Sequence, residues 1–321
     1  MTGALDLAAV RSARERIGRY VLCTPVLRIS PRPGLELFAK AESLQATGAF
    51  KLRGAFSLMT TLAPGCAGVV AHSSGNHAQA VARAARVLGL RAVVVMPEDA
   101  PPNKRARTAA DGAEIVTVGS DSDLRARRAA ELAAEQGLVP VPPFDHPLVA
   151  AGQGTSALEL LEEVESLDSF YAPVSGGGLM AGCAVALHAL QPSLELVAVE
   201  PEDANDTALS LAAGERRKVP PPRTIADGLR VRTPGELTWP VLQKHLARVA
   251  LVRDEELLDA MAFALRELRV VLEPSGAAAL AAALREGRGR VGVLLSGGNA
   301  EPALLAEAAR RAAANGYNRP R

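Results

Sequence analysis

The sequence predicts an α/β fold built on open, mostly parallel β-sheets. Short runs rich in β-branched residues recur along the 321-residue chain, and each is bounded by turn residues. Between them lie stretches with apolar residues at spacings of three and four, the pattern of an amphipathic helix. Strands that alternate with helices form βαβ units, whose strands run parallel. Parallel strands are buried on both faces, which explains why the valine and alanine runs are continuous.

The predicted strands are, in chain order, the segments 68–74, 91–97, 114–118, 170–175, 194–200 and 290–296. Helices are expected over NHAQAVARAARVLG (76–89), after the first strand, and over DLRARRAAELAAEQG (123–137), after the third. The uncharged stretch APVSGGGLMAGCAVALHAL (172–190) has the length of a membrane span. Its three glycines, its proline and its histidine instead favour a strand, a turn and a helix. The proline-rich stretches 139–147 and 219–224 are expected to be loops or boundaries.

Composition excludes several classes of function. The formal net charge is +1 and aromatic residues make up 3%, so the sequence gives no sign of a partner nucleic acid or a membrane surface. Cys23, Cys66 and Cys183 are odd in number and far apart, which predicts a reducing compartment and no disulfide framework. No basic region precedes the first apolar stretch, so no signal peptide is expected. We therefore expect a cytoplasmic protein.

Three predicted strands end in turns of small residues: SSGN (73–76), SGGGL (175–179) and SGGN (296–299). Ligands of open α/β sheets bind outside the carboxyl ends of the strands, so these turns predict one shared site. Glycines between a strand and a helix let backbone N–H groups approach an anion, and the helix N-terminus favours negative charge. The turn at 175–179 therefore suits a phosphate, and the turn at 73–76 suits a carboxylate.

The turn at 175–179 has a second interpretation. Gly176, Gly178 and Ala181 also satisfy the dinucleotide-binding pattern G-x-G-x-x-A, and Glu200 ends the next predicted strand, as that fold requires. A tight turn without any ligand is a third interpretation, since glycine serves both purposes. This stretch alone leaves all three open.

Lys51 lies among small and apolar residues in ATGAFKLRGAF (46–56). A lysine in such a setting usually carries its amine to the protein surface. If the lysine is buried instead, the pKa of its amine falls and the amine becomes a nucleophile that forms imines. Together with a turn for a phosphate and a turn for a carboxylate, such a lysine suggests pyridoxal phosphate chemistry.

The stretch around Lys51, AESLQATGAFKLRGA (41–55), resembles the lysine motif of the pyridoxal-phosphate enzymes related to threonine dehydratase and serine racemase. Six further stretches follow in that family's order: SSGNHAQ, PPFDHPLVAAGQGTSALELL, SGGGLMAG, TIADGL, EPSGAAALAA and LLSGGN. The dinucleotide interpretation accounts for only one of these seven motifs.

The resemblance implies the tryptophan synthase β-like fold of these enzymes (fold type II). In that fold, two open, mostly parallel sheets are flanked by helices, and the cofactor lies in the cleft between two domains. Residues 1–45 and 145–321 would form the large, cofactor-binding domain, and residues 46–144 the small domain. The resemblance further implies a homodimer. Few residues follow Asn299, so no appended regulatory domain is expected.

The resemblance also implies a role for each motif. Lys51 would hold pyridoxal 5'-phosphate covalently and remove the α-proton of the substrate. The residues that would bind the cofactor are Lys51, Phe50, Asn76, Ser175, Gly176, Gly177, Gly178, Leu179 and Ser296. The residues that would bind the substrate carboxylate are Ser73, Asn76 and His77.

The implied reaction is β-elimination from a small β-hydroxy amino acid. L-threonine would give 2-oxobutyrate and L-serine would give pyruvate, each with ammonia. Ser74 leaves a second activity open, because serine racemases carry serine at this position and need a second acid–base group that faces the lysine. Ser74 is therefore a candidate catalytic residue beside Lys51.

The stretch VEPEDAND (199–206) matches the divalent cation site of the racemase-like branch. Glu200, the carbonyl of Ala204 and Asp206 would be its ligands, and oxygen ligands suit Mg²⁺, Mn²⁺ or Ca²⁺. A dehydratase for a larger substrate such as 3-hydroxyaspartate is a third interpretation of the chain. The arginines that would meet its extra carboxylate are Arg105, Arg107 and Arg230.

Overall fold

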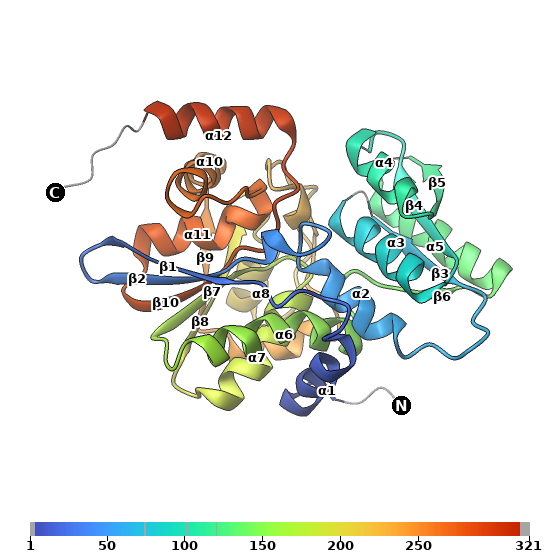
Figure 1. The fold of residues 1–321 in the computed structure, drawn as a ribbon, viewed down its shortest axis with the longest axis horizontal. Coiled ribbons are helices and arrows are strands. Elements are labelled where there is room, and N and C mark those ends of the chain that lie inside the picture. The colour runs from blue at the N-terminus through green and yellow to red at the C-terminus, as the bar shows by residue number, and fades with distance from the viewer. Residues whose placement is uncertain (1–3, 74, 101, 120, 315–321) are drawn as a thin grey trace.

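The structure, a computed structural model, describes residues 4–73, 75–100, 102–119 and 121–314. It contains two separate sheets with helices packed on them (Figure 1). The larger sheet has six strands in the order β1-β2-β10-β7-β8-β9, and the smaller has four in the order β5-β4-β3-β6. Apart from the antiparallel β1–β2 hairpin, the paired strands in these ranges run parallel. The predicted α/β fold with two mainly parallel sheets is confirmed.

The strands are β1 Val26–Arg32, β2 Leu35–Lys40, β3 Val69–His72, β4 Ala92–Pro97, β5 Glu114–Val118, β6 Val139–Pro140, β7 Ser169–Pro173, β8 Glu195–Pro201, β9 Arg248–Val252 and β10 Gly289–Leu294. The α-helices are α1 Leu7–Ile17, α2 Lys51–Met59, α3 Asn76–Leu88, α4 Pro102–Ala110, α5 Ser122–Gln136, α6 Pro147–Glu163, α7 Gly178–Leu190, α8 Asp206–Ala213, α9 Thr238–His245, α10 Asp254–Phe263, α11 Pro274–Glu286 and α12 Pro302–Ala314. Short helical turns are η1 Glu42–Leu44, η2 Asp227–Leu229 and η3 Ala264–Leu268.

All predicted strands are present, and so are the two helices predicted after β3 and β5. The stretch 172–190 forms the end of β7, a turn and α7, as expected. No helix in the described ranges is long and apolar enough to cross a membrane. The sequence does not predict β1, β2, β6 or β9. β1 and β9 are the edges of the large sheet, and Arg28 interrupts the apolar pattern of β1.

We call residues 69–140, which hold the four-stranded sheet with α3, α4 and α5, the small lobe. We call residues 4–50 and 145–314, which hold the six-stranded sheet, the large lobe. In the large lobe, α11 packs on one face of the sheet, with α10 against α11 and α12 against α10, and α6, α7 and α9 lie on the side of the other face (Figure 1). The domain boundaries at residues 45 and 144 stay a prediction.

Helix α2 connects the two lobes and packs against both. The apolar face of α2 packs against α6 of the large lobe and against β3 and α3 of the small lobe. These elements form one core cluster that includes Leu52, Phe56, Val81 and Val149. The approach of α2 to α6 is very close, because a Cβ on Gly152 would lie 2.4 Å from the Cβ of Ser57. This apolar contact holds the lobes together on the side of α2 and α6.

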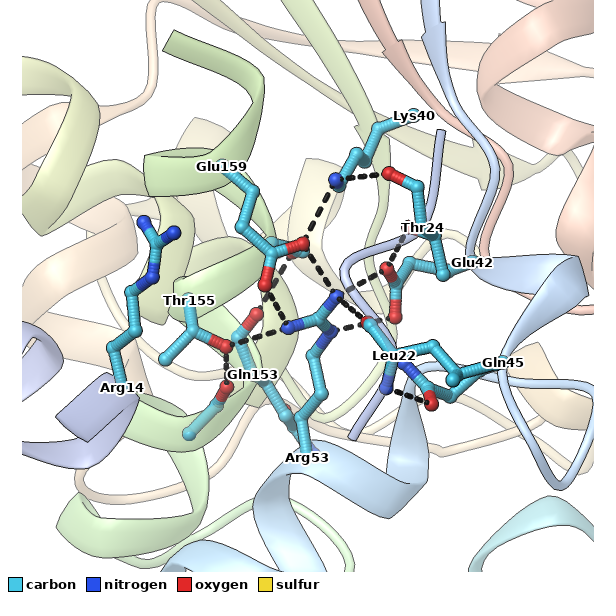
Figure 2. A network of polar contacts seen from close by, with 12 residues as sticks. Arg14, Leu22, Thr24, Lys40, Glu42, Gln45, Arg53, Gln153, Thr155 and Glu159 are labelled. Carbon is cyan, nitrogen blue, oxygen red and sulfur yellow. Dashed lines mark hydrogen bonds and ion pairs between the residues drawn. The ribbon is translucent and has the colours of Figure 1, made fainter. Parts of the chain in front are cut away.

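A buried ion network fixes α2 (Figure 2). Arg53, whose side chain is fully buried, donates from Nε and Nη2 to Glu42 at 2.7 and 2.8 Å. Its Nη1 and Nη2 donate to Glu159 at 2.7 Å each, and the ammonium of Lys40 lies 2.8 Å from the same carboxylate. The network therefore ties α2 to β2, η1 and α6, and Lys51 is the first residue of this helix.

Arg53→Met should lower the free energy of unfolding by about 3–5 kcal/mol, because Glu42 and Glu159 would keep buried charges that lack a cationic partner. Equilibrium urea denaturation followed by circular dichroism measures this change. Arg91→Met is the matched control, since the Arg91–Glu114 pair is exposed at the surface and such pairs contribute little. Equal stability of the two variants would contradict the role given to the network.

Candidate active site

The lysine motif and the turn after β10 lie side by side. Ala49 and Gly297 form an antiparallel β-bridge, and the backbone N–H of Phe50 donates to the carbonyl of Ser296 at 3.1 Å. The side chain of Ser296 is buried beside the start of α2. The structure thus brings together residues far apart in the sequence, Lys51 and the third predicted turn.

Lys51 directs its amine into the protein. Its Nζ donates to the carbonyl of Pro143 at 2.7 Å and lies 5.0 Å from the centre of the Phe50 ring. Burial lowers the pKa of the Lys51 amine to about 8. An unperturbed lysine has a pKa of about 10.4, so a far larger fraction of this amine is neutral near pH 7. A neutral amine attacks carbonyl carbons and accepts protons.

The turn at 175–179 has the geometry of an anion cradle. Gly177 has a φ of 94°, a conformation that favours glycine, and α7 begins at Gly178. The first N–H groups of such a helix lack intrahelical partners. The hydroxyl of Ser175 is buried, and no described residue hydrogen-bonds to it. A phosphate would satisfy both the hydroxyl and these N–H groups.

Two further elements fix this cradle. Thr238 Oγ1, at the start of α9, donates to the carbonyl of Gly176 at 2.7 Å. Asp145 in turn accepts from the backbone N–H groups of Glu236 and Leu237 at 2.8 and 2.9 Å, next to Thr238. The ring of Phe144, which follows Pro143, leaves no room for a side chain at position 176. The segment 143–145 therefore lies between Lys51 and the cradle and contacts both.

The turn before α3 meets the same site from the small lobe. Asn76 Nδ2 donates to Glu273 Oε1 at 2.5 Å, and Asn76 Oδ1 accepts from Asn299 at 2.8 Å. Ser73 Oγ accepts from the N–H of Gly75 at 3.2 Å. Ser74 lies outside the described residues. The first turn of α3 supplies N–H groups that suit a carboxylate.

The His77 side chain is turned away from this helix end. Its ring is buried, and its Nε2 lies 2.8 Å from the carbonyl of Val141. Burial, with the nearby charge of Lys51 as a second cause, lowers the pKa of His77 to about 3. The ring is therefore neutral, and the backbone N–H of His77 is the group that could face a carboxylate.

Glu200 and Asp206 lie together at the end of β8 and the start of α8, and both are fully buried, as is Ala204. Glu200 accepts from the N–H groups of Thr207 and Ala208 at 3.0 Å each. Both carboxylate oxygens of Asp206 are buried without a hydrogen-bond partner among the described residues. A buried carboxylate pair in which the Asp206 oxygens lack partners fits a cation held by oxygen ligands.

Sequence reasoning did not single out Glu273, Lys104, Asp227, Thr238 or Asp145. Three of them, Glu273, Asp227 and Asp145, stand in motifs that the sequence did reveal (EPSGAAALAA, TIADGL and PPFDHPLVAAGQGTSALELL), so their positions could have been suspected. The pKa of Glu273 is raised to about 7; burial is the main cause, and the charge of Asp227 is the second. Lys104 stands in a basic run that resembles an exposed helix face, and only the structure shows that it is buried.

Comparison with known proteins agrees with this geometry. The profile of one family, described as "Pyridoxal-phosphate dependent enzyme", matches residues 17–297. The chain belongs to this family. The match covers Lys51, the first two glycine turns and the start of the third, so the resemblance seen in the motifs is confirmed.

Relatives within the family carry several activities. An L-threo-3-hydroxyaspartate ammonia-lyase of Saccharomyces cerevisiae is 42% identical over 302 residues, which are 91% of this chain and 92% of that protein. A serine racemase of Oryza sativa subsp. indica is 41% identical over 318 residues, 95% and 94% of the two chains. A crystal structure of the threonine deaminase of T.th. has a TM-score of 0.88 and 44% identity, over 92% of this chain and 99% of that one. This enzyme family therefore acts on small amino acids, by ammonia-lyase or racemase chemistry.

The pKa of Lys51 gives a pH prediction for a pyridoxal-phosphate enzyme. Only the neutral amine attacks the aldehyde of the cofactor, so apoenzyme should combine with pyridoxal phosphate about tenfold faster per pH unit up to about pH 8 and then reach a plateau. Stopped-flow absorbance of the visible imine band measures the rate. A rise that continues to about pH 10 would show an ordinary lysine. Lys51→Ala should form no such band.

Proposed function

We propose that this protein is a pyridoxal-phosphate-dependent dehydratase (ammonia-lyase) of small β-hydroxy amino acids. L-threonine would give 2-oxobutyrate and L-serine would give pyruvate, each with ammonia. The observation that carries the proposal is the placement of Lys51, whose amine has a pKa of about 8, among a phosphate cradle, a carboxylate turn and Ser296.

The residues of the site fit the cofactor. Ser175, Gly176, Gly177, Gly178 and Leu179 would hold its phosphate, and the orphaned Ser175 hydroxyl supports this assignment. When bound, pyridoxal phosphate supplies an electron sink that acidifies the C–H bond next to the amino group of the substrate. Phe50 would lie beside the ring, and Asn76 would meet its hydroxyl group.

Lys51 is the proton-transfer group of the proposed reaction. Its neutral amine takes the α-proton of the amino acid, a general-base step worth about 10²–10⁴-fold in rate. Loss of the α-proton and the β-hydroxyl removes water from the substrate and leaves an enamine. Hydrolysis of the enamine returns one water and gives the 2-oxo acid and ammonia.

The other residues orient the reactants. The N–H groups at the start of α3, with Ser73, hold the substrate carboxylate. Ser296 would face the pyridine nitrogen with a neutral hydroxyl. Because a neutral partner leaves that nitrogen unprotonated, the site favours elimination over reactions that need a long-lived carbanion. The arrangement therefore supports a lyase first.

A second candidate function is serine racemase activity with eliminase side activity. The buried pair of Glu200 and Asp206 favours it, because this pair matches the cation site of the racemase-like branch. We propose that Glu200, Asp206 and the Ala204 carbonyl bind Mg²⁺, Mn²⁺ or Ca²⁺ at the end of β8, next to the strand that leads into the phosphate cradle.

A third candidate function is dehydration of 3-hydroxyaspartate, which is supported by the similarity to the yeast L-threo-3-hydroxyaspartate ammonia-lyase. Of the arginines that could meet a second carboxylate, Arg105 and Arg230 donate to the carbonyls of Glu98 and Thr224. Arg107 donates to Asn299 at 2.7 Å, and Asn299 contacts Asn76. Arg107 is therefore the arginine of the three that reaches the site.

The proposed function is tested by incubating holoenzyme with Mg²⁺ and L-serine, L-threonine or L-threo-3-hydroxyaspartate in parallel. We expect 2-oxo acid and ammonia from serine and threonine, with little D-serine. D-serine formed as fast as pyruvate would make the protein a racemase. Turnover of hydroxyaspartate alone would contradict the proposed substrate class, and no turnover of any substrate would contradict the function.

Cation binding has its own test. Mg²⁺ should raise the Tm of the wild-type protein and should raise its activity, because it would neutralise two buried carboxylates. Asp206→Asn should abolish both effects while the protein stays folded in the absence of the metal. Glu202→Gln is the control, since Glu202 is an exposed acid in the same loop. Equal Tm with Mg²⁺ and with chelator would contradict the site.

A further inference from the structure

Among the described residues, the small lobe makes four polar contacts with the large lobe at the site. Asn76 Nδ2 donates to Glu273 at 2.5 Å. Lys104 forms an ion pair with Asp227, and Arg107 Nη1 donates to Asn299 Oδ1 at 2.7 Å. Lys104 and Arg107 are three residues apart on α4 and therefore lie on one face of that helix. Asn299 Nδ2 also donates to Asn76 Oδ1 at 2.8 Å, and we call these four the interlobe polar contacts.

The Lys104 ammonium lies directly over the turn that starts α3. A Cβ on Gly75 would lie 3.7 Å from Lys104 Nζ, and the Lys104 side chain is only 5% exposed. Its partner Asp227 is 36% exposed and belongs to η2, where the N–H of Gly228 donates to Ser275 at 2.9 Å. The ion pair thus joins α4 and the carboxylate turn to the segment 273–275 of the large lobe.

The contacts form a connected set around Asn76. Asn299 donates to Asn76 and accepts from Arg107. Glu273 accepts from Asn76 and lies within the electrostatic reach of both Asp227 and Lys104. A movement of α4 that breaks the Lys104–Asp227 pair therefore changes the surroundings of the Asn76 amide as well.

The two sides of the lobe boundary differ in kind. On the side of α2 and α6 the lobes share an apolar core that includes Leu52, Phe56 and Val149. On the side of α4 the interlobe contacts are hydrogen bonds and an ion pair. Water replaces polar contacts at small net cost, whereas exposure of an apolar core is expensive. Separation of the lobes at α4 would therefore cost less free energy than separation at α2.

We propose that Lys104 and Asp227 are positioning residues that fasten α4 and the α3 turn of the small lobe over the substrate site. Their pairing holds residues 75–77, at the start of α3, where they bind the substrate carboxylate, and its rupture opens the side of the site that α4 covers. The effect on substrate binding rests on the proposed function, but the fastening of the lobes does not.

The test uses holoenzyme carrying Lys104→Met, Asp227→Asn or both substitutions. Hydrogen–deuterium exchange of α4 and of residues 73–79 should be about fivefold faster in each single variant. The KM for L-serine should rise about tenfold, with a much smaller change in kcat, because the reacting groups at Lys51 are untouched. In the double variant, the exchange rate and the KM should change by much less than the product of the changes in the two single variants, because the two residues interact with each other.

Arg91→Met is the control. Arg91 pairs with Glu114 inside the small lobe, so this substitution should leave hydrogen–deuterium exchange and the KM for L-serine unchanged. Unchanged exchange in Lys104→Met, or single effects that multiply in the double variant, would overturn the proposal. If the wild-type enzyme turns over no β-hydroxy amino acid, the proposed function fails. The exchange experiment then still decides whether the lobes are fastened at α4.

Discussion

The site depends on one buried interaction, the network of Arg53 with Glu42 and Glu159. Arg53 follows Lys51 by two positions on α2, so the network fixes the helix turn that presents the reactive amine. Burial alone would raise the pKa of Glu159, but the hydrogen bonds and charge of Arg53 lower it. The carboxylate therefore stays ionised and its attraction to Arg53 and Lys40 persists. Isolated buried charges cost several kcal/mol, so this cluster tolerates few changes.

Around this fixed helix, the site combines rigid and separable parts. The turn proposed to hold the phosphate lies in the large lobe, where Thr238 and Asp145 fix it. The carboxylate turn belongs to the small lobe and reaches the large lobe through polar contacts. Such a division suits an enzyme that keeps its cofactor through many turnovers and exchanges a small substrate in each one. Lys51 stands near the joint between the lobes, where its amine contacts Pro143.

Sequence patterns predicted the buried parallel strands well because such strands consist of continuous apolar runs, as in β4 and β10. The edge strand β1 escaped prediction because Arg28 interrupts its apolar pattern, whereas β9 was missed although residues 249–252 form an apolar run. Lys51 and the glycine turns could be predicted because each stands in a local sequence motif. The hydrogen-bond partners of Asn76 lie far along the chain and were found only in the structure. Lys104 resembles part of an exposed basic run, yet contact with Asp227, far along the chain, buries it.

The central claim is that Lys51 is the residue that carries pyridoxal phosphate. The most direct measurement is borohydride reduction of the holoenzyme, followed by proteolysis and mass spectrometry of the labelled peptide. The account predicts a single phosphopyridoxyl group on Lys51. Labelling of Lys40, Lys104, Lys218 or Lys244 in its place, or a protein that takes up no cofactor, would contradict the account.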